Sequence, residues 1–279
     1  MNDLKNKLNF LSGWKSEEHK ETFNIWNRMS KNYFKYTFSS FEENKYLIRY
    51  QSSKSKFSIL DFGCSSGYLK RFLNFYYGKN YDYIGYDVSE ESIKLAKQLY
   101  GEKFFTSEND LFLNSDLNKK KFDIVYSRDT VLHQKDPWKF IDDLILKVKK
   151  HLILRLRTRN KGETILDLNK SCQLVPGEKW VPYIVLNYNE LIQYLKKYNF
   201  KLILTNRSKV VLGGKNKRFL DKALYLNETE GAETSIFASY DKGLEKKGLI
   251  ETNNLEGHDY IKKNHLTTTL FKILNKLKI

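Results

Sequence analysis

The chain of 279 residues has few of the features that mark several large classes of protein. It has only two cysteines, Cys64 and Cys172, which excludes a disulfide-stabilised scaffold and a zinc site of four cysteines. No stretch approaches the roughly 18 consecutive apolar residues of a transmembrane helix. The first residues also lack the apolar segment of a secretory signal. We therefore expect a soluble, cytoplasmic protein without a metal site.

Arginine is also scarce, although the chain as a whole is strongly basic. Its 49 lysines and arginines exceed its 33 acidic residues, which gives a net charge of +16, but only nine of the 49 are arginine. Basic proteins often bind nucleic acids. Phosphate and base recognition, however, favours arginine because its guanidinium group forms paired hydrogen bonds. The abundant Lys, Asn, Ile, Tyr and Phe share AT-rich codons, which offers a second origin for the charge. We therefore rank a nucleic acid below a small molecule as a partner.

Segments with the patterns of strands and helices alternate along most of the chain. Short apolar runs are followed by segments whose apolar residues lie three and four positions apart, as on one helix face. Ser89 and Pro137 stand where the first residues of helices are expected. We expect strands at 57–61, 81–86, 103–106, 122–126, 151–155 and 200–204, helices at 68–77, 89–99, 137–148 and 189–198, and a closing hairpin of 223–226 with 234–239. This alternation predicts an α/β domain with a largely parallel sheet.

An N-terminal region and an insertion depart from this alternation. Residues 1–50 are interpreted as a helical cap, because aromatic and apolar residues recur there at helical spacings. These residues are Phe23, Trp26, Met29, Tyr33 and Tyr36. Residues 56–240 form the central domain, interrupted after the fifth strand by residues 158–187. A loop this long in a compact domain is commonly a lid over a ligand site, and a plain surface insertion is the alternative.

The C-terminal region, residues 241–279, is predicted to be a helical extension. Within it, residues 258–279 place leucines and isoleucines on one helix face and lysines around it. Such a basic amphipathic helix would dock on its own domain, on a second subunit or on an anionic membrane surface. The sequence leaves the oligomeric state open.

The segment 59–67, with the sequence ILDFGCSSG, carries the strongest functional signal. An apolar strand ends in Asp61, and Gly63 and Gly67 then allow a tight turn into a helix and a close approach to a ligand. The spacing differs from the G-x-G-x-x-G of dinucleotide sites, and an acid before the first glycine disfavours a pyrophosphate. The next strand ends in Asp87, at a position where a carboxylate commonly accepts both hydroxyls of a ribose.

Together these residues resemble the class I S-adenosylmethionine-dependent methyltransferases, whose first motif is close to LDxGCGxG. The resemblance covers residues 33–240. It implies a Rossmann-like, mostly parallel sheet of about seven strands with helices on both faces, and S-adenosylmethionine as the cofactor. Ser65 departs from the usual middle glycine, and a positive φ would be less comfortable for a serine.

The resemblance also assigns residues to the cofactor, at the ends of the first four strands and in the N-terminal cap. At the methionine end they are Asp61, Gly63, Cys64, Ser65 and Gly67, and at the ribose and adenine they are Asp87, Val88 and Glu108. Ser127, Arg128 and Tyr33 would make the remaining contacts with the cofactor. Asn109 and Asp110 compete with Glu108 for the contact with the adenine amine. Tyr36 competes with Tyr33 as the aromatic residue that closes over the cofactor.

The segment 127–133 follows the fourth strand and is similar to the family's segment that faces the acceptor. Asp129 and His133 are the candidate catalytic residues, because a hydroxyl acceptor needs a group that takes its proton. His133 could instead bond to a backbone carbonyl, and Asp129 could be ion-paired with Arg128. Nearby, alternating arginines at 155–159 could clamp an anionic substrate or form a solvated edge.

We therefore expect methyl transfer to a small molecule or a glycan, at a hydroxyl group. The Asn/Asp-Pro-Pro-aromatic signature of enzymes that methylate base amines is missing after the fourth strand. Neither Cys64 nor Cys172 fits the strand-end cysteine that methylates pyrimidine carbon. Two alternatives stay open: an RNA methyltransferase, supported by the net charge alone, and a non-catalytic methyltransferase-like binding protein.

Overall fold

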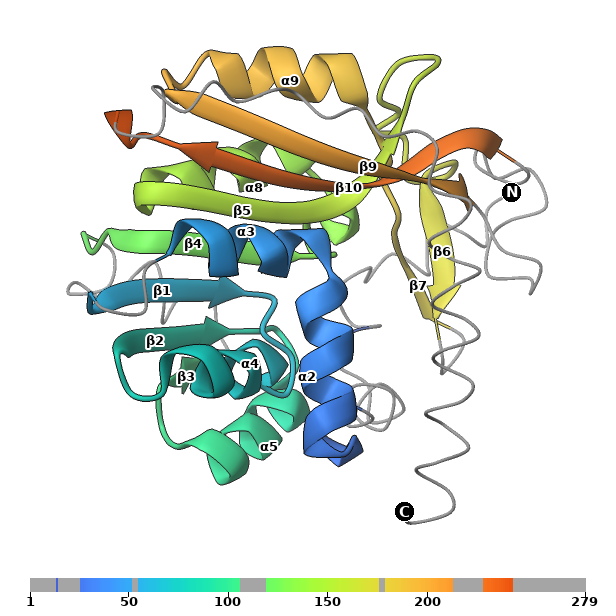
Figure 1. Ribbon diagram of the computed structural model, residues 1–279. Helices are drawn as coiled ribbons and strands as arrows, with labels where there is room; N and C mark the ends of the chain where they lie inside the picture. Colours follow the sequence, from blue (N-terminus) through green and yellow to red (C-terminus); the bar gives the residue numbers. More distant parts are fainter. Residues whose placement is uncertain are drawn as a thin grey trace.

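The computed structural model describes residue 14 and residues 26–51, 55–105, 119–175, 179–212 and 228–242. This part of the chain forms one large mixed sheet covered by helices on both faces (Figure 1). The strands are β1 (Phe57–Phe62), β2 (Tyr81–Tyr86), β3 (Phe104–Phe105), β4 (Phe122–Arg128), β5 (Val148–Arg159), β6 (Cys172–Val175), β7 (Lys179–Pro182), β8 (Leu186–Asn187), β9 (Leu202–Leu212) and β10 (Glu228–Ser239). The helices are α2 (Lys31–Ser40), α3 (Glu42–Tyr50), α4 (Tyr68–Tyr77), α5 (Glu90–Tyr100), the 3₁₀ helix η3 (Val131–His133), α8 (Pro137–Leu146) and α9 (Tyr188–Lys196).

The order of the strands locates the place where a ligand would bind. The sheet runs β3–β2–β1–β4–β5–β10–β9, and the short β8 pairs with β5. The first five of these strands are parallel, whereas β10 is antiparallel to both of its neighbours. The connections reverse direction between β1 and β4, and ligands of open α/β sheets bind at the carboxyl ends of the strands at such a switch point. The predicted α/β fold of about seven main strands is confirmed.

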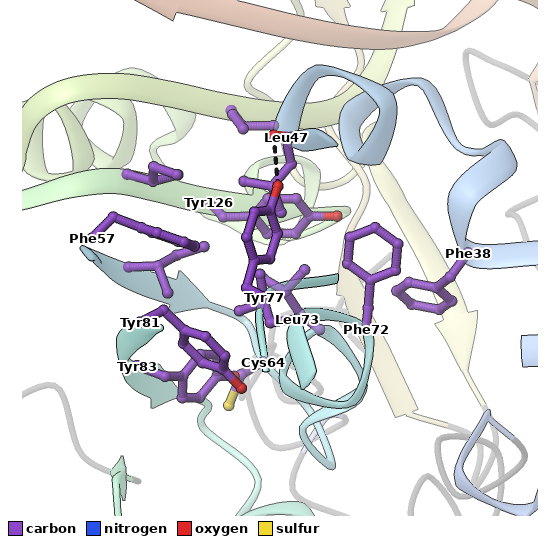
Figure 2. Packing of buried hydrophobic residues seen from close by; sticks show 14 of the residues in the cluster. Phe38, Leu47, Phe57, Cys64, Phe72, Leu73, Tyr77, Tyr81, Tyr83 and Tyr126 are labelled. Atoms are coloured by element: carbon purple, nitrogen blue, oxygen red, sulfur yellow. Dashed lines mark hydrogen bonds between the residues drawn. The ribbon is translucent and has the colours of Figure 1, made fainter. Parts of the chain in front are cut away.

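The central strands are apolar because they are buried on both faces of the sheet. β1, β2 and β4 carry almost continuous buried positions, as expected of parallel strands covered twice. Helices α2 to α5 enclose one apolar cluster, and α8 and α9 enclose the other. In the first cluster the Tyr77 hydroxyl donates to the carbonyl of Leu47, 2.9 Å away, which ties α4 to α3 (Figure 2).

Two helices begin where the sequence predicted them to begin. The Ser89 hydroxyl accepts a hydrogen bond from the Ser92 amide at the start of α5. Pro137 is the first residue of α8, and the Asp136 carboxylate accepts from the next two amides. These side chains satisfy amides that have no partner within the first turn of a helix.

The N-terminal cap differs from the single helical face that the spacing suggested. Phe23 lies outside the described residues, and the helical pattern is broken at Ser30, whose hydroxyl accepts from the Tyr33 amide and starts α2. A second break at Phe41 separates α2 from α3. As a result Tyr33 is buried while Tyr36 is half exposed. Two short helices, each with its own buried side, replace the expected continuous one.

The expected closing hairpin of 223–226 with 234–239 is wrong. Strand β10 pairs along 234–239 with β5 on one edge and with β9 on the other, so both of its edges are filled. Residues 223–226 and 258–279, with the predicted amphipathic helix, lie outside the described residues. Within the described part of the chain, no helix is long and apolar enough to cross a membrane.

The insertion at 158–187 contains a small antiparallel hairpin of its own. Strands β6 and β7 pair with each other, and Figure 1 shows them beyond the edge toward which β1 and β2 point. The Ile184 amide donates to the carbonyl of Leu132 at 2.8 Å, which joins the end of the hairpin to η3. The insertion therefore lies against the segment that follows β4.

Candidate active site

A cavity of about 340 Å³ lies at the carboxyl ends of β1, β2, β4 and β5, beside the switch point of the sheet. Its wall is built from loops and strand ends that are far apart in the sequence. The lining residues are Trp14, Trp26, Phe62, Gly63, Ser65, Tyr68, Tyr86, Asp87, Val88, Arg128, Asp129, Thr130, His133, Gln134, Arg155 and Arg157. Five of the eleven predicted cofactor residues and both predicted catalytic residues therefore meet in one place.

The turn after β1 has the backbone shape that the glycine motif predicted. Gly63 and Gly67 have φ of 82° and 81°, in the left-handed region that favours glycine. A Cβ on Gly63 would also collide with the Thr130 side chain, so this position has no room for a larger residue. Ser65 has a φ of 50°, so the strain expected for a serine at this position is confirmed.

Asp87 is held rigidly at the end of β2 by two backbone amides. One carboxylate oxygen accepts from the Ser65 amide at 2.8 Å, and the other accepts from the Ser89 amide at 2.9 Å. Burial raises the pKa of the Asp87 carboxyl, against the effect of these hydrogen bonds. Because a carboxylate oxygen has two lone pairs, each oxygen of Asp87 has capacity for a further donor from the cavity.

A network of charges forms another part of the wall. Asp129 is ion-paired with Arg155 and lies 4.0 Å from both Arg128 and Arg157. Removal from water alone would raise the pKa of the Asp129 carboxyl, but these three arginines together lower it below its ordinary value. Asp129 also has a φ of 56°, an uncommon backbone shape of the kind often held at functional sites.

Glu43 anchors this network from beneath and was not predicted from the sequence. Its side chain is buried on α3, with one oxygen 2.9 Å from Nε of Arg128 and 3.8 Å from Nε of Arg155. The other oxygen accepts from the Ser235 hydroxyl at 2.9 Å. Glu43 raises the pKa of Arg128 despite the burial of that guanidinium. The N-terminal cap therefore fixes the two arginines through one carboxylate.

His133 lies where η3 meets the insertion. Its Nδ1 is 2.8 Å from the carbonyl oxygen of Pro182 on β7. A carbonyl can only accept, so we assign a proton to Nδ1, which leaves Nε2 as the nitrogen that could take a proton from an acceptor. The ring packs against Trp14, with 4.4 Å between the ring centroids. The predicted carbonyl bond is thus present, and it orients the ring that lines the cavity.

Comparison with known families decides the identity. The family model described as "Methyltransferase domain" matches residues 53–198, more than half of the chain. The chain belongs to the class I S-adenosylmethionine-dependent methyltransferases. No curated protein matches it significantly. The matched segment contains the glycine turn, Asp87 and the 127–133 segment of this methyltransferase.

Solved structures resemble this chain at low sequence identity. The N-terminal domain of EvdMO1 with SAH bound is 14% identical, with a TM-score of 0.50 over 80% of this chain and 95% of that one. Magnesium protoporphyrin IX methyltransferase (ChlM) from Synechocystis PCC 6803 with bound SAM is 15% identical, with a TM-score of 0.48 over 83% and 96%. A SAM-dependent methyltransferase from Archaeoglobus fulgidus is 18% identical, with a TM-score of 0.47 over 78% and 98%.

The other predicted cofactor residues of the methyltransferase do not line the cavity. Cys64 is fully buried, and burial raises the pKa of its thiol. Gly67 directly precedes α4 and lies against side chains of α5 and β3, while Ser127 and Tyr33 are buried. Glu108, with its two competitors, lies outside the described residues. The cofactor contacts assigned to these residues stay predictions.

Asp61 is buried beneath the glycine turn. Its carboxylate accepts from the Tyr83 hydroxyl at 2.7 Å, on the face of β1 that packs against α4. Burial raises the pKa of Asp61 to about 7, although the bond from Tyr83 opposes this shift. In the structure Asp61 therefore supports the turn from below.

The Asp61→Asn variant is expected to be more stable than the parent protein at pH 8, and nearly equal to it at pH 4. Native Asp61 keeps its proton up to about pH 7, whereas the unfolded chain releases it near pH 4. The parent protein therefore loses stability as the pH rises through this interval, and the asparagine variant does not. Thermal melts at several pH values test this, because 1 kcal/mol shifts the midpoint of a domain of this size by about 2–4 °C. A midpoint difference that does not grow with pH would contradict it.

Five aromatic residues of the wall were not assigned to the site from the sequence: Trp14, Trp26, Phe62, Tyr68 and Tyr86. The carbonyl of Trp26 accepts from the Arg71 guanidinium at 2.6 Å, and the Asn27 amide donates to the Ser66 hydroxyl at 2.8 Å. The segment before α2 is therefore tied directly to the glycine turn. Tyr68 had a visible signal, because it is the first residue after Gly67, whereas Trp14 and Trp26 reach the cavity only through tertiary structure.

Proposed function

We propose that this methyltransferase transfers the methyl group to a hydroxyl of a small molecule or sugar. The observation that carries the proposal is one cavity with two different walls. The glycine turn and Asp87 form one wall, and His133 with the charged network forms the other. Side chains of the N-terminal region and of η3 close the space between them, which suits an acceptor small enough to be surrounded.

The residues of the first wall fit S-adenosylmethionine. Gly63 leaves a cradle that a Cβ would fill, and Asp87 has lone pairs directed by two amides, as two ribose hydroxyls require. Val88 lines the cavity next to Asp87 and would pack on the adenine. When bound, the cofactor supplies an electrophilic methyl group on a sulfonium. Ser65 donates its amide to Asp87, so its strained backbone helps to orient that carboxylate.

His133 and Asp129 would then have different roles. The Pro182 carbonyl holds the proton of His133 on Nδ1, so Nε2 is the nitrogen that can accept the proton of a hydroxyl. Asp129 stays ionised at neutral pH because of its arginine neighbours. An ionised carboxylate with a low pKa is a weak base but a strong hydrogen-bond acceptor, so we assign Asp129 to orienting the acceptor hydroxyl.

The insertion would act as a lid that keeps the acceptor in place. The carbonyl that orients His133 belongs to β7, and the amide of Ile184 bonds to η3. Movement of the hairpin would therefore disturb the imidazole as well as the opening of the cavity. A lid of this kind positions the acceptor and excludes water at the same time.

Incubation of the protein with S-adenosylmethionine and a panel of acceptors tests the proposal. The panel would hold sugars and phenols, matched amines and thiols, and structured RNA, with mass spectrometry to locate the added methyl group. We expect methylation of a hydroxyl in the small-molecule group. Methylation of RNA at physiological salt, or of amines only, would overturn the proposal. We expect RNA to bind only weakly and without sequence preference at physiological salt, because the attraction of diffuse lysines falls steeply as salt rises.

A further inference from the structure

Three of the nine arginines of the chain lie side by side in the wall of the cavity. Arg128 on β4 is the register partner of Arg155 on β5, and Arg157 follows two residues later on the same face of β5. Arg157 in turn is the register partner of Glu233 on β10. Two adjacent strands thus place these guanidinium groups at one end of the sheet, with Glu233 of a third strand beside them.

The carboxylates that balance these arginines are placed unequally around the cavity. Asp129 lines it, whereas Glu43 is buried under α3 and Glu233 is not part of the wall. This part of the wall therefore presents three guanidinium groups and one carboxylate. Because electrostatic interactions weaken with distance, a ligand in the cavity meets a positively charged surface on this side.

Arg157 is the member of this group that is most open to the cavity. Its side chain keeps 22% of its exposure, against 8% for Arg155 and 9% for Arg128. Its Nη1 lies 3.2 Å from Glu233 but makes no hydrogen bond to any residue that the structure describes. An arginine has five N–H donors in a planar fork, so Arg157 has donor capacity for a ligand.

The carboxylates next to Arg155 do not fully compensate for the removal of its guanidinium group from water. Burial, together with repulsion from Arg128 and Arg157, lowers its pKa to about 10 in spite of the attraction of Asp129 and Glu43. The charged form of Arg155 is therefore less stable here than in water. An additional anion near Arg155 and Arg157 would stabilise it.

We infer that the methyl acceptor carries an oxyanion, either a carboxylate or a phosphate, which binds to Arg157 with support from Arg155. This inference rests on the proposed small-molecule acceptor and names its chemical class. Arginine pairs with both oxyanions through two parallel N–H donors. The aromatic side chains of Trp14, Trp26 and Tyr68 supply apolar surface for the rest of the acceptor. Small aromatic oxyanions are therefore suitable probes.

Calorimetry tests the inference. It measures the binding of benzoate, phenyl phosphate and uncharged benzamide to the SAH-loaded protein. We expect one or both anions to bind and benzamide to bind about tenfold more weakly or worse, since a charge-assisted hydrogen bond is worth about 1.5–3 kcal/mol. The two anions distinguish a carboxylate from a phosphate. Inorganic phosphate alone would report the anion site without the aromatic contacts. Equal affinities for benzamide and for both anions would overturn the inference.

Two variants with opposite expected effects distinguish a loss of the anion site from a loss of folding. Arg157→Gln should weaken the anions by about 10- to 100-fold while SAH affinity stays within about threefold. Glu233→Gln removes a carboxylate that competes for Arg155 and Arg157, so the anions should bind more tightly. Arg49→Gln, an exposed position on α3, controls for the change in net charge. Weaker anion binding in Glu233→Gln, or no change in Arg157→Gln, would overturn the inference.

These outcomes do not depend on which atom is methylated. Failure of the proposed function would appear as methyl groups on amines or on RNA in the acceptor panel, while anion binding to the SAH complex would be unaffected. Failure of the anion site would leave SAH binding and methylation of uncharged hydroxyl compounds intact. The two results are therefore separable.

Discussion

Replacing His133 with alanine is expected to lower methyl transfer to a hydroxyl acceptor by about 100-fold or more, because general-base catalysis typically contributes 10² to 10⁴ in rate. The imidazole lines the cavity, and its Nδ1 is fixed by the Pro182 carbonyl, so the basic Nε2 is held in a defined position. Cofactor affinity should change by no more than a few-fold, since the glycine turn and Asp87 are left unchanged. Single-turnover rates and SAH calorimetry measure the two quantities separately.

A matched variant distinguishes the base from a contact that only holds the lid. In His133→Asn the amide nitrogen can still donate to the Pro182 carbonyl, but no basic nitrogen remains. If His133 is the base, the asparagine variant should be nearly as slow as the alanine variant. Recovery of near-normal turnover in His133→Asn would show that the imidazole acts only through β7. It would also favour an acceptor that is already nucleophilic.

The parts of the fold that could be predicted from the sequence are those in which one local signal decides. β1, β2 and β4 are short apolar runs, because their two faces are both covered by helices. Ser89 and Pro137 mark helix starts through their own chemistry. The strand expected at 151–155 stops short of the end of β5 at Arg159, because most of the residues after Arg155 are polar. The polar residues Arg157, Thr158 and Arg159 pair across strands with β10, whereas Leu156 packs in the core.

The candidate site could be predicted only where the chain itself brings its parts together. The glycine turn, Asp87 and the 127–133 segment follow strand ends, and the carboxyl ends of parallel strands meet at one edge. Glu43 carries no such signal, since an acid in the first turn of a helix is ordinary. Its burial against Arg128 depends on how α3 packs over the sheet. Trp14 likewise reaches His133 from a distant part of the chain.

Two residues of the site have strained backbones. Ser65 and Asp129 have positive φ although neither is glycine, and both line the cavity. Ser65 presents its amide to Asp87, and Asp129 turns its carboxylate back toward Arg155. Each strained residue thus places one polar group of the site, which is the pattern expected when backbone strain is retained for function. A serine in place of the usual middle glycine is therefore compatible with an intact site.

Asp87→Ala is expected to weaken S-adenosylmethionine binding by about 100-fold, because two charge-assisted hydrogen bonds of about 1.5–3 kcal/mol each would be lost, in part replaced by water. The variant also removes the acceptor for the Ser65 and Ser89 amides, so some loss of thermal stability should accompany it. Asp82→Ala, a partly exposed position on the same strand that pairs with Lys56, is the matched control.

Asp87→Asn separates the two functions of this carboxylate. Asparagine keeps one acceptor oxygen for a backbone amide but cannot offer two acceptors to a pair of ribose hydroxyls. We therefore expect cofactor affinity to stay about tenfold or more below that of the parent protein, even if the thermal midpoint of Asp87→Asn is largely restored. Unchanged cofactor affinity in both Asp87 variants would place the ribose elsewhere in the cavity. If the parent protein itself does not bind S-adenosylmethionine, the proposed cofactor site is wrong.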